Sequence, residues 1–73
     1  MDEATAVKFK VFTKDGYLYE TNDLIEKENK VIVVKPIHIL KSNNEGFSNT
    51  KLSKNKNYDV YFENISYIQK PSD

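Results

Sequence analysis

Residues capable of acid–base or nucleophilic chemistry are few in this chain and lie far apart. His38 is the single histidine, cysteine is absent, and the serines are expected in turns. Nucleophilic catalysis needs a base within hydrogen-bond reach of the nucleophile and a third group that orients the base. We therefore predict that the protein is not an enzyme. A lone histidine in an apolar strand is more commonly a hydrogen-bonded structural residue than a ligand or a general base.

Residues for a metal or cofactor site are equally scarce. A structural zinc site takes about four ligands from Cys, His and carboxylate groups, and His38 has no thiolate to assist it. The two glycines, Gly16 and Gly46, stand too far apart in the sequence to form a phosphate-cradling loop. We predict neither a metal nor a cofactor.

Aromatic and lysine side chains are the better candidates, and their chemistry is binding. Exposed aromatic rings beside lysines suit protein hot spots or the stacking of nucleic-acid bases. The predicted partner-binding residues are Tyr17, Tyr19, Phe47, Lys51, Lys54 and Lys56. Two alternatives stay open: the tyrosines could pack across strands of a sheet, and the lysines could belong to a solvated loop.

The charge balance indicates which partners to expect. Eleven lysines match eleven acidic residues, so the formal net charge is zero, and arginine is absent. Strong non-specific binding to nucleic acid depends on an excess of basic residues facing phosphates. A protein partner is therefore favoured over RNA, which remains the alternative. No apolar run approaches the roughly 18 residues of a membrane span and the first residues are acidic, so we predict a cytoplasmic protein with no membrane contact.

The length of 73 residues predicts one domain over 1–73. Within it we expect a frayed N-terminus over 1–5, a long polar loop over 42–57 and a C-terminal tail over 70–73. A chain this short has a marginal core and no disulfide to stabilise it. Support from a partner protein or from homo-oligomerisation is therefore expected.

Hydrophobic alternation places five strands along the chain. Val7 to Val11 alternates with a period of two, and Asp15-Gly16 is a strong hairpin signal before the run that starts at Tyr17. An apolar run begins at Val31, and Pro36 requires it to bend, because proline cannot donate a hydrogen bond within a sheet. Strands around 58–62 and 65–68 complete the set. We predict an all-β fold: a small, five-stranded, strongly bent antiparallel barrel.

This order of elements resembles the Sm-like and SH3-like small β-barrels, and in particular the bacterial Hfq-like branch of the Sm family. Residues 7–34 are similar to the first family motif: a strand, a glycine-containing turn, a long bent strand and an apolar third strand. Residues 60–68 are similar to the second motif, in which a hydrophobic residue, Tyr, Lys-His and Ala-Ile-Ser lead into the last strand. The resemblance implies a ring-forming RNA-binding protein.

The chain departs from that family at residues important for function. The Lys-His pair that reads uridine-rich RNA in the family falls on Phe62-Glu63 here, and a carboxylate repels phosphate. The glycine of the second strand is missing near Thr21, and the N-terminal helix has no counterpart in 1–5. Two hypotheses follow. The first is a non-enzymatic module that docks a protein partner, and the residue bias of an AT-rich genome suits a phage or mobile-element product that modulates a host factor. The second is an Sm-like RNA-binding homo-oligomeric ring.

Overall fold

Strands make up the regular structure of this protein almost entirely. The structure is a computed structural model and describes residues 7–71; it is all-β, with one short 3₁₀ turn, and no helix in that range is long and apolar enough to cross a membrane. In chain order the elements are β1 (Phe9–Thr13), β2 (Tyr17–Thr21), β3 (Leu24–Glu26), β4 (Lys30–Val33), β5 (His38–Asn43), β6 (Gly46–Asn49), β7 (Tyr58–Tyr61), η2 (Phe62–Asn64) and β8 (Ile65–Gln69).

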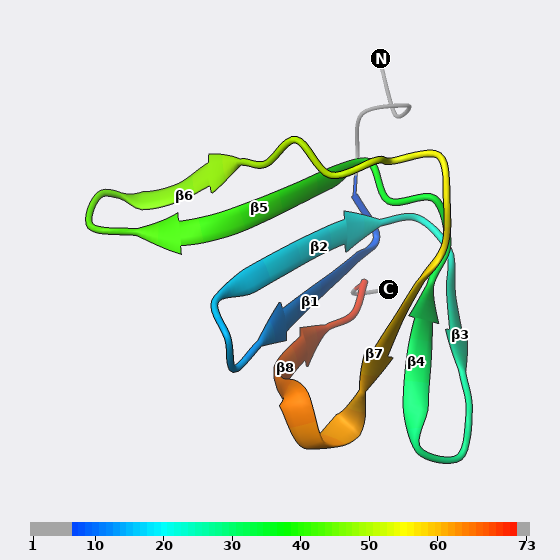
Figure 1. The fold of residues 1–73 in the computed structure, drawn as a ribbon. Helices are drawn as coiled ribbons and strands as arrows, with labels where there is room; N and C mark the ends of the chain where they lie inside the picture. Colours follow the sequence, from blue (N-terminus) through cyan, green and yellow to red (C-terminus); the bar gives the residue numbers. More distant parts are fainter. Residues whose placement is uncertain (1–6, 72–73) are drawn as a thin grey trace.

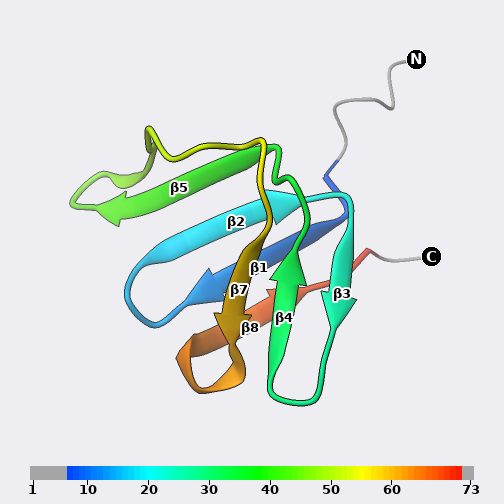
Figure 2. The same cartoon turned by 45° about the vertical axis from the view of Figure 1, so that its right-hand side comes forward.

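The strands form two antiparallel sheets. A five-stranded sheet has the order β6-β5-β2-β1-β8, and a three-stranded sheet has the order β3-β4-β7 (Figure 1). Figure 2 shows the three-stranded sheet lying across β1 and β8 of the larger one, with the strands crossing steeply. The five-stranded sheet therefore has an inner face toward the smaller sheet and an outer face that points away from it.

The chain passes from one sheet to the other at sharp bends. Only Asn22 and Asp23 separate β2 from β3, and the segment around the buried Pro36 separates β4 from β5. Lys35, beside that proline, has a φ of 42°, in the left-handed region. These two bends divide two of the five predicted strands, and β6, which was not predicted, brings the number of strands to eight. No closed barrel is found over residues 7–71.

The core lies between the two sheets. Val11 of β1, Val31 and Val33 of β4 and Val60 of β7 are at most 4% exposed. Partly buried hydrophobic residues pack around them: Tyr19, Leu24, Tyr58, Ile65 and Ile68. Ile39 of β5, the register partner of Tyr19, is also buried, with 2% exposed. The core is therefore small, and burial returns only about 25 cal/mol per Å² of apolar area.

The first hairpin is confirmed where Asp15-Gly16 predicted it. β1 and β2 pair in antiparallel register, and the Gly16 amide donates a hydrogen bond to the Thr13 carbonyl oxygen at 3.1 Å. Gly16 has a φ of 96°, a conformation that side chains with a Cβ rarely adopt. Glycine is required at this position for that reason.

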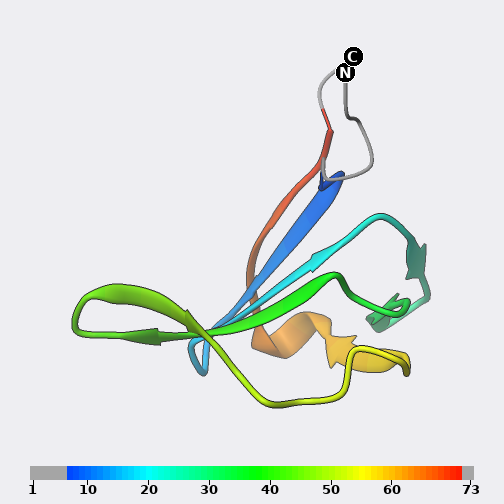
Figure 3. The same ribbon diagram turned by 90° about the horizontal axis from the view of Figure 1, so that it is seen from above.

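The predicted polar loop over 42–57 is wrong in its first half. β5 runs to Asn43 and pairs with β6 in a second hairpin, which turns at a Gly46 with a φ of 120°. Figure 3 shows this hairpin reaching out beyond the other strands. Polar, exposed strands carry no hydrophobic alternation, so composition alone predicted a loop. The connection over 50–57 is irregular, and so is the described part of the predicted tail, 70–71. The predicted frayed terminus, 1–5, lies outside the described residues.

Candidate functional site

The six predicted partner-binding residues do not form one site. Tyr17 and Tyr19 lie on the inner face of β2. Phe47 lies on the outer face of the same sheet, because its register partner is Ser42. Ser42 shares that face with Leu40 and with Leu18, the register partner of Leu40. The lysines at 51, 54 and 56 are exposed in the connection over 50–57. The structure therefore separates the predicted tyrosines from the predicted phenylalanine by the thickness of a sheet.

The inner-face tyrosines form a row that ends in lysines. The ring centroids of Tyr17 and Tyr19 are 6.3 Å apart, and those of Tyr19 and Tyr58 are 5.6 Å apart. Lys41 Nζ lies 4.3 Å from the Tyr17 centroid, and Lys56 Nζ lies 5.4 Å from that of Tyr58. Burial raises the pKa of Tyr19. Tyr19 packs against the buried valines, and of the three predicted lysines only Lys56 joins the row.

The outer face of the five-stranded sheet carries a second group of rings from three different strands. Phe12 of β1 contacts Phe47 of β6 edge-to-face, with centroids 6.2 Å apart, and Tyr67 of β8 lies 5.9 Å from Phe12. Phe47 is 46% exposed and Tyr67 is 58% exposed. We call Phe12, Phe47 and Tyr67 the outer aromatic cluster.

Two leucines lie between the strands that supply these rings. Phe12 is paired with Leu18 of β2, and Leu18 is paired with Leu40 of β5, so all three share the outer face. Because β2 and β5 separate β1 from β6, the rings of Phe12 and Phe47 meet over these leucines, and Leu18 is only 6% exposed. The result is a continuous apolar surface on a face that no other described element covers. Its rings at Phe12 and Tyr67 were not predicted. Extending the alternation of Val7 to Val11 by one residue would have placed Phe12 on the face opposite Val11.

A polar row borders the outer aromatic cluster on the same face. Lys10, Glu20 and His38 are register partners on β1, β2 and β5. Glu20 contacts His38 Nδ1 at 2.9 Å and Lys10 Nζ at 3.9 Å. His38 is thus a hydrogen-bonded residue, as the sequence favours.

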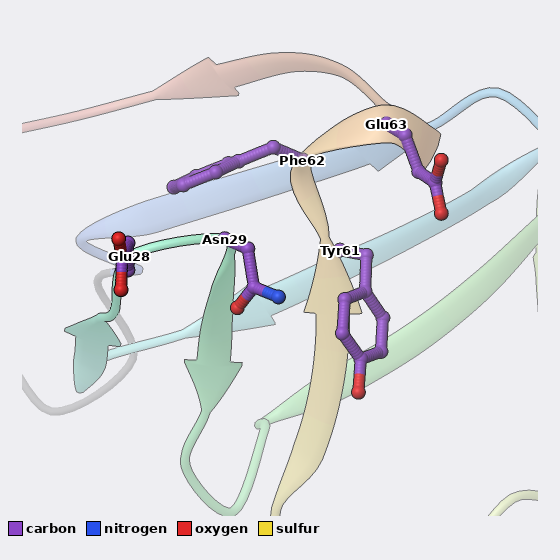
Figure 4. A pocket seen from close by; sticks show the side chains of 5 residues that line it. All are labelled: Glu28, Asn29, Tyr61, Phe62 and Glu63. Carbon is purple, nitrogen blue, oxygen red and sulfur yellow. The ribbon is translucent and has the colours of Figure 1, made fainter.

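A pocket of about 390 Å³ lies at the end of the molecule where β4 begins and β7 ends. Its lining consists of Glu28 and Asn29 from the β3–β4 turn and Tyr61, Phe62 and Glu63 from the β7–η2 junction (Figure 4). The Phe62 amide donates a hydrogen bond to the Asn29 carbonyl oxygen at 3.1 Å, which fixes the two segments together. The sequence singled out Phe62 and Glu63 only as a departure from the Sm-like motif.

Near this pocket the lysine Lys30 has an acidic partner, whereas the two glutamates that line the pocket have no basic partner among the described residues. Lys30 Nζ donates a hydrogen bond to Asp59 at 3.0 Å, which raises the pKa of Lys30, and it lies 5.5 Å from the Tyr61 centroid. Glu28 and Glu63 make no ion pair with any basic side chain that the structure describes. Two carboxylates therefore line an open, partly aromatic pocket, and neither has an ion-pair partner within residues 7–71.

Over residues 7–71 no group of three or more His, Asp or Glu side chains is placed to hold a metal ion. Comparison with protein-family models, with curated proteins and with solved structures found no match for this chain. Its function must be inferred from the surfaces described above.

Proposed function

We propose that this protein is a small non-enzymatic binding module that docks a partner protein on the outer face of its five-stranded sheet. The observation that carries the proposal is the outer aromatic cluster, Phe12, Phe47 and Tyr67, which lies over two leucines on a face that no other described element covers. Aromatic residues dominate the energetics of protein interfaces, whereas a solvated sheet face normally alternates to polar residues.

The surface also defines the chemistry of the partner. Its centre is apolar, so the partner must present apolar side chains there. The row formed by Lys10, Glu20 and His38 is already paired within the chain and supplies a polar rim. An apolar centre with a satisfied polar rim favours a folded protein surface over a phosphate backbone.

Paired variants test the proposal. The tagged protein is used to capture proteins from lysates of low-GC bacteria, the host class that the residue bias indicates. The double variant Phe47→Ser/Tyr67→Ser should lose the captured protein, because it removes two rings of the outer aromatic cluster. Both rings are exposed, so their loss should cost the fold little stability. Ile25→Ser is the matched control, since Ile25 is 43% exposed but lies on the smaller sheet, and it should retain capture. Equal capture by all three proteins, or no capture at all, would contradict the proposal.

The alternative is an Sm-like RNA-binding ring built on an SH3-like or Sm-like barrel. The strand pairing supports such an architecture: with β2–β3, β4–β5 and β6–β7 each taken as one bent strand, the chain has five strands in the order β8, β1, β2–β3, β4–β5, β6–β7. The tyrosine row with Lys41 and Lys56 supports base stacking. RNA binding that weakens steeply with salt, and weakens further when Lys51, Lys54 and Lys56 are changed to Gln, would favour this alternative.

A further inference from the structure

We propose that the pocket between the β3–β4 turn and η2 binds a lysine or arginine side chain of a partner protein. The inference concerns a second contact point, separate from the outer aromatic cluster, because none of its five lining residues belongs to the five-stranded sheet. It does not depend on the outer face being a docking surface.

The walls of the pocket suit the alkyl part and the charged head of such a side chain. Tyr61 and Phe62 are each 43% exposed, so both present ring surface to solvent. Figure 4 shows the Phe62 ring extending toward Glu28. The side chains of Tyr61 and Glu63 both point toward the bottom of that view. A ligand cation thus meets ring surface and a carboxylate at either end of the pocket. Its volume is near the lower end of the range of about 300–1,000 Å³ for small-ligand sites, which suits one side chain.

A cation already lies against one of these rings. The Lys30 ammonium group is 5.5 Å from the Tyr61 centroid and is held there by Asp59 at 3.0 Å. Lys30 is thereby neutralised, whereas the Phe62 ring has no cation near it among the described residues. The arrangement around Lys30, an ammonium group between a ring and a carboxylate, is the one that we propose for the partner's side chain at Phe62.

The charge of the site decides between a basic and an acidic partner. Glu28 and Glu63 line the pocket, no basic residue lines it, and Lys27 is the one further cation of the turn. Phosphate or a carboxylate would be repelled by these two carboxylates, which make no ion pair within the described residues. A basic segment of a protein is attracted by the same charges and can place its aliphatic chain on the rings.

The test is an NMR titration of the whole protein with three capped tripeptides, Gly-Lys-Gly, Gly-Arg-Gly and Gly-norleucine-Gly. The lysine and arginine peptides should shift the amide signals of Asn29, Phe62 and Glu63, and the uncharged norleucine peptide should not. Glu28→Gln/Glu63→Gln should weaken binding about tenfold and Phe62→Leu about three- to fivefold, as expected for a partly exposed cation–π contact. Glu45→Gln, an exposed acid in the β5–β6 turn, is the matched control and should bind as the wild type does.

Dispersed spectra of each variant show that it is folded. The proposal is overturned if norleucine shifts the same signals equally, if the double glutamine variant binds unchanged, or if spermidine binds and both basic peptides do not, which would make the site a polyamine site. The Phe47→Ser/Tyr67→Ser variant should still bind the basic peptides. A failure of the outer face is therefore distinguishable from a failure of the pocket.

Discussion

Asp15 is held in place by the side chain of Thr13, two residues before it in the first turn. The Thr13 hydroxyl donates a hydrogen bond to the Asp15 carboxylate and also accepts one from the Tyr17 amide at 2.9 Å. The bond from Thr13 is the main cause of a lowered Asp15 pKa, with smaller contributions from Asn64 and Lys41. The carboxylate is therefore stabilised in the folded turn more than in the unfolded chain.

That shift predicts a pH dependence of stability. Because the folded pKa lies below the ordinary value of 3.8, the stabilisation is complete above that value and is lost as the pH falls through the lowered pKa. Asp15→Asn should lower the unfolding free energy at neutral pH, and the difference from wild type should shrink toward about pH 2. Urea unfolding of both proteins across this range measures it, with Glu45→Gln as control. A difference that is constant with pH would contradict the assignment.

Single residues also show how far the sequence can predict a site. The alternation of a strand over Tyr17-Leu18-Tyr19 puts the two tyrosines on one face and Leu18 on the other, as the structure has them, but it cannot say which face a second sheet covers. The pocket was beyond prediction, because it requires Asn29 to meet Phe62 and these residues are far apart in the sequence. Local periodicity carries no information on such a contact.

Thr21 fixes the junction between the elements of the two sheets. It is fully buried at the end of β2, and its hydroxyl lies 2.9 Å from the Val34 carbonyl oxygen, just after β4. The Asp23 amide donates to the same hydroxyl at 3.2 Å. One side chain therefore ties the β2–β3 bend to the β4–β5 bend, near the position where the Sm-like pattern has a glycine.

Replacing that hydroxyl by a methyl group should weaken the junction. Thr21→Val keeps the volume but leaves the Val34 carbonyl and the Asp23 amide without this partner, at a cost of about 1–3 kcal/mol in unfolding free energy. Thr21→Ser keeps the hydroxyl and loses a methyl group, for about 1 kcal/mol. Chemical denaturation compares the two, and a serine variant less stable than the valine variant would show that packing, not hydrogen bonding, holds the bend.

The two glycine turns allow strain to be separated from crowding. A Cβ on Gly16 would lie 2.9 Å from Ser42 Oγ, whereas a Cβ on Gly46 would meet nothing within 4 Å. Both have positive φ, so each alanine variant should lose about 1–3 kcal/mol of unfolding free energy to strain, and Gly16→Ala should lose more. Thermal melts of the two variants give the order. Gly46→Ala as the more destabilised variant would contradict the role of the Ser42 contact.

Elements with strong local signals were predicted well, and elements defined by partners were not. The β1–β2 hairpin follows from alternation and Asp15-Gly16, and the bend at Pro36 follows from its missing amide. The β5–β6 hairpin was predicted as loop, because Ser42 to Asn49 is polar apart from Phe47 and its pairing depends on β5 continuing past the end of its pairing with β2. A strand that is exposed on both faces has no hydrophobic pattern to reveal it.

Each of the two sheets ends in strands that have one unpaired edge within residues 7–71. β6 and β8 are the edges of the larger sheet, and β3 and β7 are the edges of the smaller one. All four are short, with five residues in β8, four in β6 and β7 and three in β3. Short edge strands are one way in which proteins avoid pairing with copies of themselves. This geometry disfavours a ring that depends on edge pairing.

We therefore expect a monomer in solution, with a mass near 8.5 kDa by light scattering at two protein concentrations a hundredfold apart. A protein-binding module needs no self-association. The net charge of the chain is zero, so a ring of several copies would gather no excess of basic residues for binding phosphates. A stable hexamer or heptamer at both concentrations would contradict this expectation and favour the RNA-binding ring. A mass that rises with concentration and falls to the monomer in the Phe47→Ser/Tyr67→Ser variant would instead place a second copy on the outer face.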